Sequence, residues 1–231
     1  MLYVKENVIR LREEIDALAR QTGRCGADIT LVAVTKMQPI PAIQATLLAG
    51  VDACGENRVQ ELLEKREAGA YGETPLHLIG HLQKNKVRKV VGGVALIQSV
   101  DSLSLLRAID RVAEEMGITQ DVLLQVNIGE DPDKFGIHAP EIWEFLDQIA
   151  AFSHVRVRGL MTMPPILDDL REIRRLFARM HQLFVDIRGK RHHNIHMDYL
   201  SMGMSGDFFD AILEGANMVR VGSTIFGSRY Q

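Results

Sequence analysis

The chain has 231 residues, of which 46% are hydrophobic and 25% charged, and its formal net charge is −3. This composition is close to that of an ordinary soluble globular domain, and a mildly acidic chain is not built around a nucleic-acid footprint. Cys25 and Cys54 cannot form a disulfide framework, the apolar runs are too short to cross a bilayer, and the first residues lack a secretory pattern. We therefore expect a cytoplasmic protein that binds neither nucleic acid nor membrane.

The chain begins with a helical pattern over residues 5–21, where Val8, Leu11, Ile15 and Leu18 recur at steps of three and four. After it, short runs rich in Val, Ile and Leu alternate with amphipathic stretches of helical period. Continuous apolar runs are typical of parallel strands that are buried on both faces. The runs are Ile29–Met37, Val51–Glu56, Leu76–Gly80, Ala95–Val100, Val122–Ile128, Val155–Met163, Tyr199–Met204 and Met218–Phe226.

Eight strands that alternate with helices predict an α/β fold, a single TIM-type (β/α)8 barrel preceded by an extra N-terminal helix. The usual size of such a barrel, about 250 residues, matches the chain, so residues 1–231 are expected to form one domain. An open, doubly wound parallel sheet is the alternative.

The first predicted strand ends in a lysine, Lys36. Side chains alternate along a strand, so Val32, Val34 and Lys36 share one face. If this face points into the barrel, desolvation lowers the pKa of the lysine, and a neutral amine can form a Schiff base with an aldehyde. A lysine that reaches out to solvent is the alternative.

The last predicted strand contains Arg220 between valines, and arginine is rarely buried without a partner. Barrel closure places this strand beside the first one, so Arg220 and Lys36 can face the same ligand. The loops after the last two strands are rich in glycine, serine and threonine, and the one after Leu200 leads into an expected helix, Asp207–Glu214. Such loops in barrels often bind phosphate, although plain turns are the alternative.

A lysine that can form an imine, a phosphate-binding loop pair and an arginine together suggest pyridoxal 5'-phosphate, a vitamin B6 cofactor. An arginine at the pyridine nitrogen donates a hydrogen bond and keeps that nitrogen unprotonated, which makes the ring a weaker electron sink.

Five separated segments resemble the pyridoxal phosphate homeostasis proteins, whose fold is similar to the barrel domain of alanine racemase. The resemblance covers nearly the whole chain, although Leu76, Arg58 and Ser223 stand where tryptophan, tyrosine and threonine are common in the family. The segments are Val32–Lys36, Gly55–Asn57, His77–Lys86, Leu200–Ser205 and Arg220–Ser223.

The resemblance implies a set of cofactor-binding residues. Lys36 would be the Schiff-base lysine and Arg220 the partner of the pyridine nitrogen. Asn57 would lie near the cofactor, and the phosphate and its surroundings would be held by Ser201, Met202, Gly203, Gly222 and Ser223.

The family is thought to bind, buffer or deliver pyridoxal phosphate within the cell without a known catalysed reaction. Racemisation needs a base on each face of the substrate, and one barrel uses up this chain and leaves no second domain to supply one. We therefore expect a non-enzymatic monomer with no catalytic residues, with apo forms of pyridoxal phosphate enzymes as candidate partners. A racemase-like enzyme and a lysine-dependent barrel aldolase are the alternatives.

Two further groups of residues, a histidine pair and a basic cluster, have patterns that could bind a ligand. His192 and His196 have the spacing of a metal-binding pair, but no glutamate follows the first histidine, so we expect a solvated loop and no metal. A basic cluster is expected to be a solvated helix face, with contact to an acidic partner or to a second phosphate-bearing ligand as the alternative. Its members are Lys84, Lys86, Arg88 and Lys89.

Overall fold

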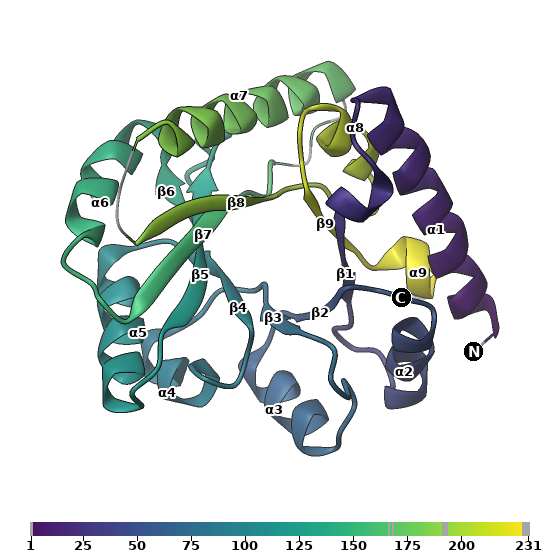
Figure 1. Cartoon of the computed structure of the whole chain (residues 1–231), viewed down its shortest axis with the longest axis horizontal. Helices are drawn as coiled ribbons and strands as arrows, with labels where there is room; N and C mark the ends of the chain where they lie inside the picture. The colour runs from purple at the N-terminus through teal and green to yellow at the C-terminus, as the bar shows by residue number, and fades with distance from the viewer. Residues whose placement is uncertain (1, 166, 168, 191–193, 228–231) are drawn as a thin grey trace.

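The computed structural model describes residues 2–165, 167, 169–190 and 194–227. Its centre is a ring of parallel strands (Figure 1) in the order β4-β3-β2-β1-β9-β8-β7-β5, closed by a further pairing of β4 with β5. The eight strands of the ring are β1 (Thr30–Val34), β2 (Ala53–Glu56), β3 (Leu76–Leu78), β4 (Leu96–Val100), β5 (Gln120–Asn127), β7 (Val155–Met161), β8 (Ile195–Ser201) and β9 (Met218–Val221). The predicted barrel is confirmed, and the open sheet is wrong because β4 and β5 are not free edges.

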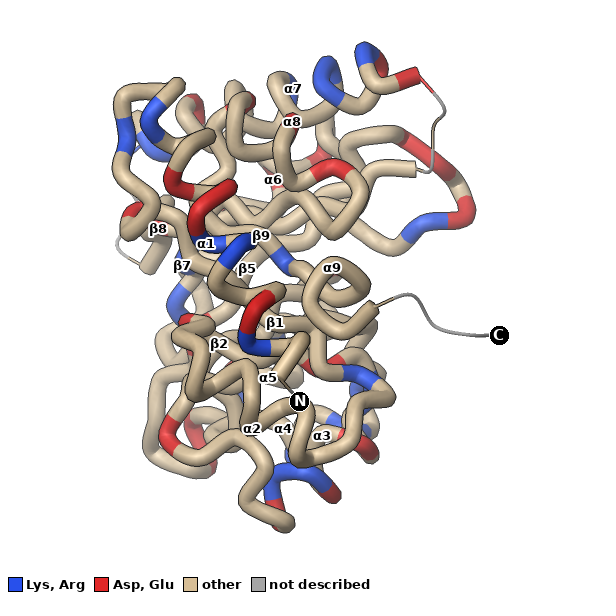
Figure 2. Tube along the Cα trace, turned by 90° about the vertical axis from the view of Figure 1, so that its right-hand side faces the viewer, with Lys and Arg blue, Asp and Glu red and all other residues tan. Residues whose placement is uncertain are grey.

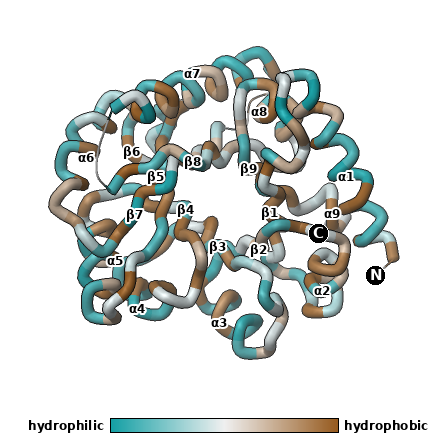
Figure 3. Tube along the Cα trace, viewed as in Figure 1, coloured by the Kyte–Doolittle hydropathy of each residue, from teal (hydrophilic) through white to brown (hydrophobic). Residues whose placement is uncertain are grey.

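A helix or helical turn follows each strand of the ring and covers its outside (Figure 1). Apolar and polar residues alternate around these helices, as amphipathic helices require (Figure 3). The helices are α2 (Ile40–Leu48), α3 (Val59–Glu67), α4 (Val87–Val90), α5 (Leu103–Glu115), α6 (Ile142–Ile149), α7 (Leu170–Arg188), α8 (Phe208–Leu213) and α9 (Ser223–Phe226), with short 3-10 turns η1 (Gly26–Asp28), η2 (Lys84–Lys86) and η3 (Ala139–Glu141).

The extra N-terminal helix predicted from the apolar spacing is α1 (Leu2–Gln21). Its buried stripe includes Val8, Leu11 and Ile15, and it packs against α2, α8 and α9 (Figure 1). The side-chain amide of Asn7 donates a hydrogen bond to the carbonyl oxygen of Ile225, 2.9 Å away. The helix therefore ties the first segment of the chain to α9, which follows the last strand.

Side chains alternate between two apolar layers, one inside the barrel and one between the barrel and the helices. On β1, Val32 belongs to the inner cluster, whereas Leu31 and Ala33 belong to the outer one. The register pairs Val32 with Arg220 of β9, so Arg220 points inward and Val219 outward. The inward face predicted for the first strand is thus confirmed at Val32.

Some element boundaries differ from the sequence-based prediction. The last apolar run does not remain a strand to Phe226, because β9 ends at Val221 and α9 begins at Ser223. Strand β8 begins at Ile195, four residues earlier than predicted. A short strand that was not predicted, β6 (Ile137–His138), pairs with the end of β5 outside the ring.

Charged residues of both signs are interspersed over the side of the molecule shown in Figure 2. In the part of the chain that the structure describes, no helix is both long enough and apolar enough to cross a membrane. His192, one of the two histidines with metal-binding spacing, lies outside the described residues. Within the described residues, no three metal-ligating side chains lie together.

Gly159 lies in an irregular stretch of the β7–β8 ladder, and its φ of 146° is a value that glycine adopts readily. A Cβ atom there would lie 1.9 Å from the carbonyl oxygen of Tyr199, which is backbone and cannot rotate away. We predict that Gly159→Ala lowers the free energy of unfolding by about 3 kcal/mol or more, measured by urea denaturation.

Gly189 is the matched control for this substitution, because the nearest atom to its added Cβ lies at an ordinary 3.5 Å. Gly189→Ala should change the free energy of unfolding by less than about 0.5 kcal/mol. Equal urea midpoints for the two variants would contradict the close packing of β7 on β8.

Candidate functional site

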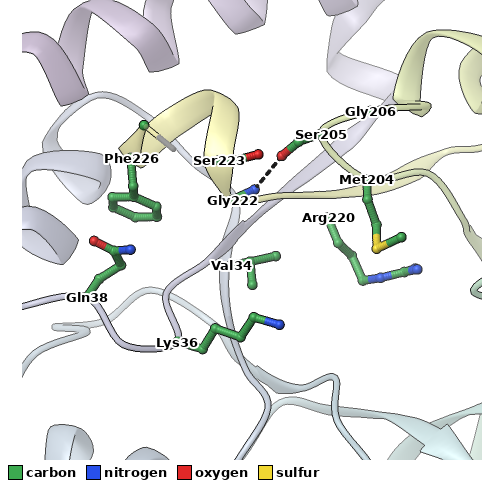
Figure 4. Close-up of a pocket in the computed structure, with 11 residues that line it drawn as sticks. Val34, Lys36, Gln38, Met204, Ser205, Gly206, Arg220, Gly222, Ser223 and Phe226 are labelled. Carbon is green, nitrogen blue, oxygen red and sulfur yellow. Dashed lines mark hydrogen bonds between the residues drawn. The ribbon is translucent and has the colours of Figure 1, made fainter. Parts of the chain in front are cut away.

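A cavity of about 360 Å³ lies at the carboxyl ends of β1 and β9 and beside the loop that follows β8 (Figure 4). This is the end of the barrel where functional groups are found in TIM-type folds. The lining residues are Val34, Lys36, Gln38, Met204, Ser205, Gly206, Arg220, Gly222, Ser223, Phe226 and Gly227.

Lys36 enters the cavity from the turn after β1, and Arg220 enters it from the neighbouring strand β9. Their side chains extend in the same direction from the two strands, with Val34 between them (Figure 4). Because Arg220 is in register with Val32, Lys36 lies further along the barrel axis, nearer the open end. An elongated ligand can therefore contact both cations without bringing them together.

Arg220 is only 2% exposed, and its guanidinium is held by two hydrogen bonds. Nη1 donates to Oγ of Ser201 at 2.6 Å, and Nη2 donates to the carbonyl oxygen of Thr162 at 2.8 Å. Burial lowers the pKa of Arg220 to about 10, and the carboxylate of Asp207 partly opposes this shift. Arg220 therefore stays charged at neutral pH and can donate further hydrogen bonds into the cavity.

The loops after β8 and β9 meet at the hydroxyl of Ser205. The backbone amides of Gly222 and Thr224 donate to Oγ of Ser205 at 3.1 and 3.4 Å (the first is drawn in Figure 4). Next to it, a Cβ atom at Gly206 would meet no heavy atom within 4 Å, so the backbone there is open to a ligand. With the hydroxyl of Ser223 in the same lining, this end of the cavity offers the donors that a phosphate group needs.

The turn that carries Lys36 is fixed on both sides of that residue. Thr35, which precedes it, donates its hydroxyl to Glu56 at 2.7 Å and accepts a hydrogen bond from Nζ of Lys65 at its carbonyl oxygen, also at 2.7 Å. Met37, which follows it, has a φ of 60° and donates its amide to Glu61. The backbone under the Lys36 side chain is therefore anchored to β2 and α3.

The centre of this anchor is a buried ion pair. Glu56 is fully buried, Lys65 is 11% exposed at its side chain, and their charged atoms lie 2.9 Å apart. Burial, followed by the charge of Glu56, raises the pKa of Tyr71, so its hydroxyl remains a donor to the same carboxylate oxygen. The other oxygen of Glu56 has no hydrogen-bond partner among the described residues. The buried negative charge of Glu56 is therefore offset mainly by the positive charge of Lys65.

Of the residues singled out from the sequence, the structure brings four together in the cavity lining, namely Lys36, Arg220, Gly222 and Ser223. Four others lie elsewhere. Ser201, Met202 and Gly203 are buried behind the lining, and Asn57 lines a separate recess of about 270 Å³ with Arg58 and His81.

The buried positions of Ser201 and Gly203 have physical reasons. The hydroxyl of Ser201 points into the barrel and is occupied by Arg220. A Cβ atom on Gly203 would approach that of Ala211 to 2.6 Å, so this glycine lets α8 pack closely on the strand end. Both residues support the cavity without lining it.

The sequence analysis gave no role to three lining residues, Gln38, Phe226 and Gly227. Met204, Ser205 and Gly206 lie in the loop after β8, which the sequence predicts to bind phosphate from its position after a barrel strand, although none of the three was chosen individually as a site residue. Phe226 was read as part of a strand, whereas α9 turns it back toward the cavity.

Comparison with protein families and with named proteins gives one consistent result. The family model for the N-terminal domain of alanine racemase matches residues 7–230. The pyridoxal phosphate homeostasis protein of Aquifex aeolicus is 37% identical over 224 residues, which cover 97% of both chains. The protein of the same name from Escherichia coli strain K12 is 37% identical over 98% of this chain and 97% of its own.

Solved structures agree with these matches. PipY of Synechococcus elongatus, solved with pyridoxal phosphate bound, is 34% identical, covers 93% of this chain and all of its own, and superposes with a TM-score of 0.80. An alanine racemase of Clostridium difficile is 18% identical, with a TM-score of 0.72 over 96% of this chain and 57% of the racemase. At that identity the racemase shows a shared fold only.

The ion pair of Glu56 with Lys65 allows a direct test of the anchor under Lys36. Lys65→Met leaves a buried carboxylate without its counter-charge, so we predict a loss of about 3–5 kcal/mol in the free energy of unfolding. Adding Glu56→Gln removes the stranded charge and should recover part of that loss. Urea denaturation of the two single variants and the double variant measures the coupling.

The control is the exposed pair of Arg111 with Glu115, because the Arg111 side chain is 78% exposed. Arg111→Met should cost less than about 1 kcal/mol. A Lys65→Met variant as stable as Arg111→Met would show that Glu56 does not depend on Lys65.

Proposed function

The chain belongs to the family of pyridoxal phosphate homeostasis proteins, and on this premise we propose that it binds pyridoxal 5'-phosphate in the cavity between Lys36 and Arg220. In this proposal residues 1–231 act as one cofactor-binding barrel that binds, buffers or delivers the cofactor inside the cell. The observation that carries the proposal is the convergence of a lysine amine, a buried arginine and a donor-rich end of the cavity. These groups match the aldehyde, the ring nitrogen and the phosphate of the cofactor.

The side chains that line the cavity provide groups that suit pyridoxal phosphate. Pyridoxal phosphate supplies an aldehyde that an amine can capture and a ring that can accept electrons. Lys36 provides the only lysine amine among the described lining residues, and the turn that carries it is held by Glu56 and Glu61. Arg220 provides a donor that stays charged, since its lowered pKa of about 10 is still well above neutral pH.

For the phosphate we propose Ser205, Gly222 and Ser223, together with the open backbone at Gly206. Support comes from the two amides that already converge on Oγ of Ser205. This assignment keeps Gly222 and Ser223 from the sequence-based set. It gives Ser201, Met202 and Gly203 a supporting role behind the cavity wall, and it leaves Asn57 as a neighbour at the barrel rim.

We propose further that the protein has no catalytic turnover, as the name of its relatives suggests. Racemisation needs a second base opposite the lysine, commonly a tyrosine. The described tyrosines are committed elsewhere: Tyr71 is bonded to Glu56, Tyr3 lies on the outside of α1, and Tyr199 lines a cavity at the opposite end of the barrel. Tyr230 lies outside the described residues.

We propose, finally, that the protein is a monomer, that it acts in the cytoplasm and that it passes its cofactor to apo enzymes. The cysteines support a reducing compartment, because both are free, Cys25 exposed and Cys54 buried. The exposed side chains of Met204, in the cavity lining, and of Met37, next to Lys36, support exchange of a ligand with other proteins.

Lys36→Ala is expected to abolish covalent capture of the cofactor. Purified protein incubated with pyridoxal phosphate and reduced with borohydride should gain one cofactor mass on Lys36, with a visible absorption band before reduction. The variant should show neither, whereas Lys89→Ala, an exposed lysine on α4, should behave as wild type. An adduct retained on another lysine of the Lys36→Ala protein would overturn the site.

A transfer assay separates delivery from turnover. The loaded wild type, mixed with an apo form of a pyridoxal phosphate enzyme, should restore that enzyme's activity, and the same sample should leave single L-amino acids unracemised. The reason is that Lys36 would serve one face of the bound cofactor, whereas none of the described tyrosines lines this cavity to serve as a second base. Rapid racemisation without transfer would favour the racemase-like alternative, and a colourless protein that cleaves phosphorylated sugars would favour an aldolase.

A further inference from the structure

A row of buried polar side chains crosses the barrel interior behind Arg220. Oγ of Ser201 donates to Oε1 of Gln98 at 2.7 Å, and Nε2 of Gln98 lies 3.0 Å from Nδ1 of His77. Ser201 and Gln98 are fully buried and His77 is 6% exposed. These side chains come from β8, β4 and β3, so the row links three separate strands to Arg220 on β9.

The row lies beside an apolar cluster inside the barrel, where Nε2 of Gln98 also approaches Sδ of Met218 to 3.2 Å. The inner cluster contains Val32, Ala53, Leu96, Leu123, Met161 and Met218. A buried amide, hydroxyl or imidazole in such surroundings is costly unless each polar atom has a partner. Aliphatic side chains would fill the same space without that cost, so packing alone does not explain the polar residues.

The orientation of Gln98 sets the direction in which the hydrogen atoms of the row run. A guanidinium has no acceptor, so Arg220 must donate to Ser201. The side-chain oxygen of Gln98 faces Ser201 and accepts its hydroxyl hydrogen, while the amide nitrogen faces Nδ1 of His77 and Sδ of Met218, both of which are acceptors. His77 must then accept at Nδ1 and carry its hydrogen on Nε2.

The surroundings of His77 agree with this tautomer. Burial lowers the pKa of His77 to about 4, so the ring is neutral at neutral pH and Nδ1 is free to accept. His77 also lines a second cavity, of about 300 Å³, at the amino ends of the strands, where Asp121 and Arg158 lie. The row thus runs from the cofactor cavity at one end of the barrel to a polar cavity at the other.

We propose that His77 and Gln98 are positioning residues that act through Ser201 to fix the orientation of the Arg220 guanidinium. With Nη1 held by Ser201 and Nη2 held by Thr162, the group cannot rotate, and its remaining N–H bonds keep a constant direction toward the cavity. The part that concerns the cofactor ring rests on the proposed function. The directed row itself does not.

The apoprotein provides the first test, because it needs no cofactor. Nitrogen-15 NMR of histidine-labelled wild type at pH 7 should show His77 with Nδ1 unprotonated and Nε2 protonated, the signal being assigned by its loss in His77→Asn. In Gln98→Glu the carboxylate can only accept, so His77 should gain a hydrogen on Nδ1. A wild-type ring protonated at Nδ1 would overturn the proposal. His77→Leu gives the same assignment of the signal if His77→Asn fails to fold.

The second test uses the loaded protein. Gln98→Met and His77→Leu remove the row, so pyridoxal phosphate should dissociate about tenfold more readily, and the absorption band of the bound cofactor should shift, since a misaligned charge-assisted hydrogen bond costs about that factor. His77→Asn keeps an acceptor for Gln98 and should stay within about twofold of wild type. Leu123→Met, an apolar exchange in the same interior, is the control.

Failure of the proposed function and failure of the positioning role give different results. If wild type captures no pyridoxal phosphate, the proposed function fails, and the NMR result alone decides the directed row. If wild type binds but Gln98→Met and His77→Leu keep its affinity and band position, the positioning role is wrong. Equal losses in His77→Asn and His77→Leu would also overturn it, because a hydrogen-bond acceptor would then make no difference.

Discussion

The pairing of β9 with β1 closes the barrel, and the site depends on that closure. It brings the last strand beside the first and sets Arg220 level with Val32, below the turn that carries Lys36. Two residues separated by most of the chain thereby line one cavity. Helix α1 reinforces the same seam from outside, since it packs on α2, α8 and α9. The first and last parts of the chain are thus held together beside the cavity that Lys36 and Arg220 line.

Barrel closure buries the guanidinium charge of Arg220 among apolar side chains, and this burial is unfavourable. Complete removal of such a charge from water costs several kcal/mol, and hydrogen bonds must offset it. Ser201 and Thr162 accept from the two terminal nitrogens, and the carboxylate of Asp207 lies near enough to oppose the drop in the pKa of Arg220. Gln98 and His77 complete the pairing behind Ser201. The arginine is therefore both charged and rigid, which suits it to hold a polar ring atom.

Lys36 is supported in a different way. Its own side chain extends into the open cavity, while the residues on either side of it are tied down by Glu56, Glu61 and Lys65. The backbone at Lys36 is therefore fixed independently of the side chain that enters the cavity. The phosphate end is built from loop atoms, with Ser205 at the junction of the loops after β8 and β9. The cavity thus combines a buried guanidinium, a lysine amine on an anchored turn and a cluster of hydrogen-bond donors.

The sequence by itself determined the barrel and the placement of Lys36 and Arg220 in the lining of one cavity. Those features follow from local rules: continuous apolar runs, alternation along a strand, and the position of polar residues at strand ends. Tertiary structure alone decided that Ser201 serves Arg220, that Ser205 replaces it in the cavity lining, and that His77 and Gln98 stand behind both. Residues from β3, β4, β8 and β9 meet only across the barrel interior, where side-chain direction and depth depend on strand register and tilt, and no spacing along the chain encodes these.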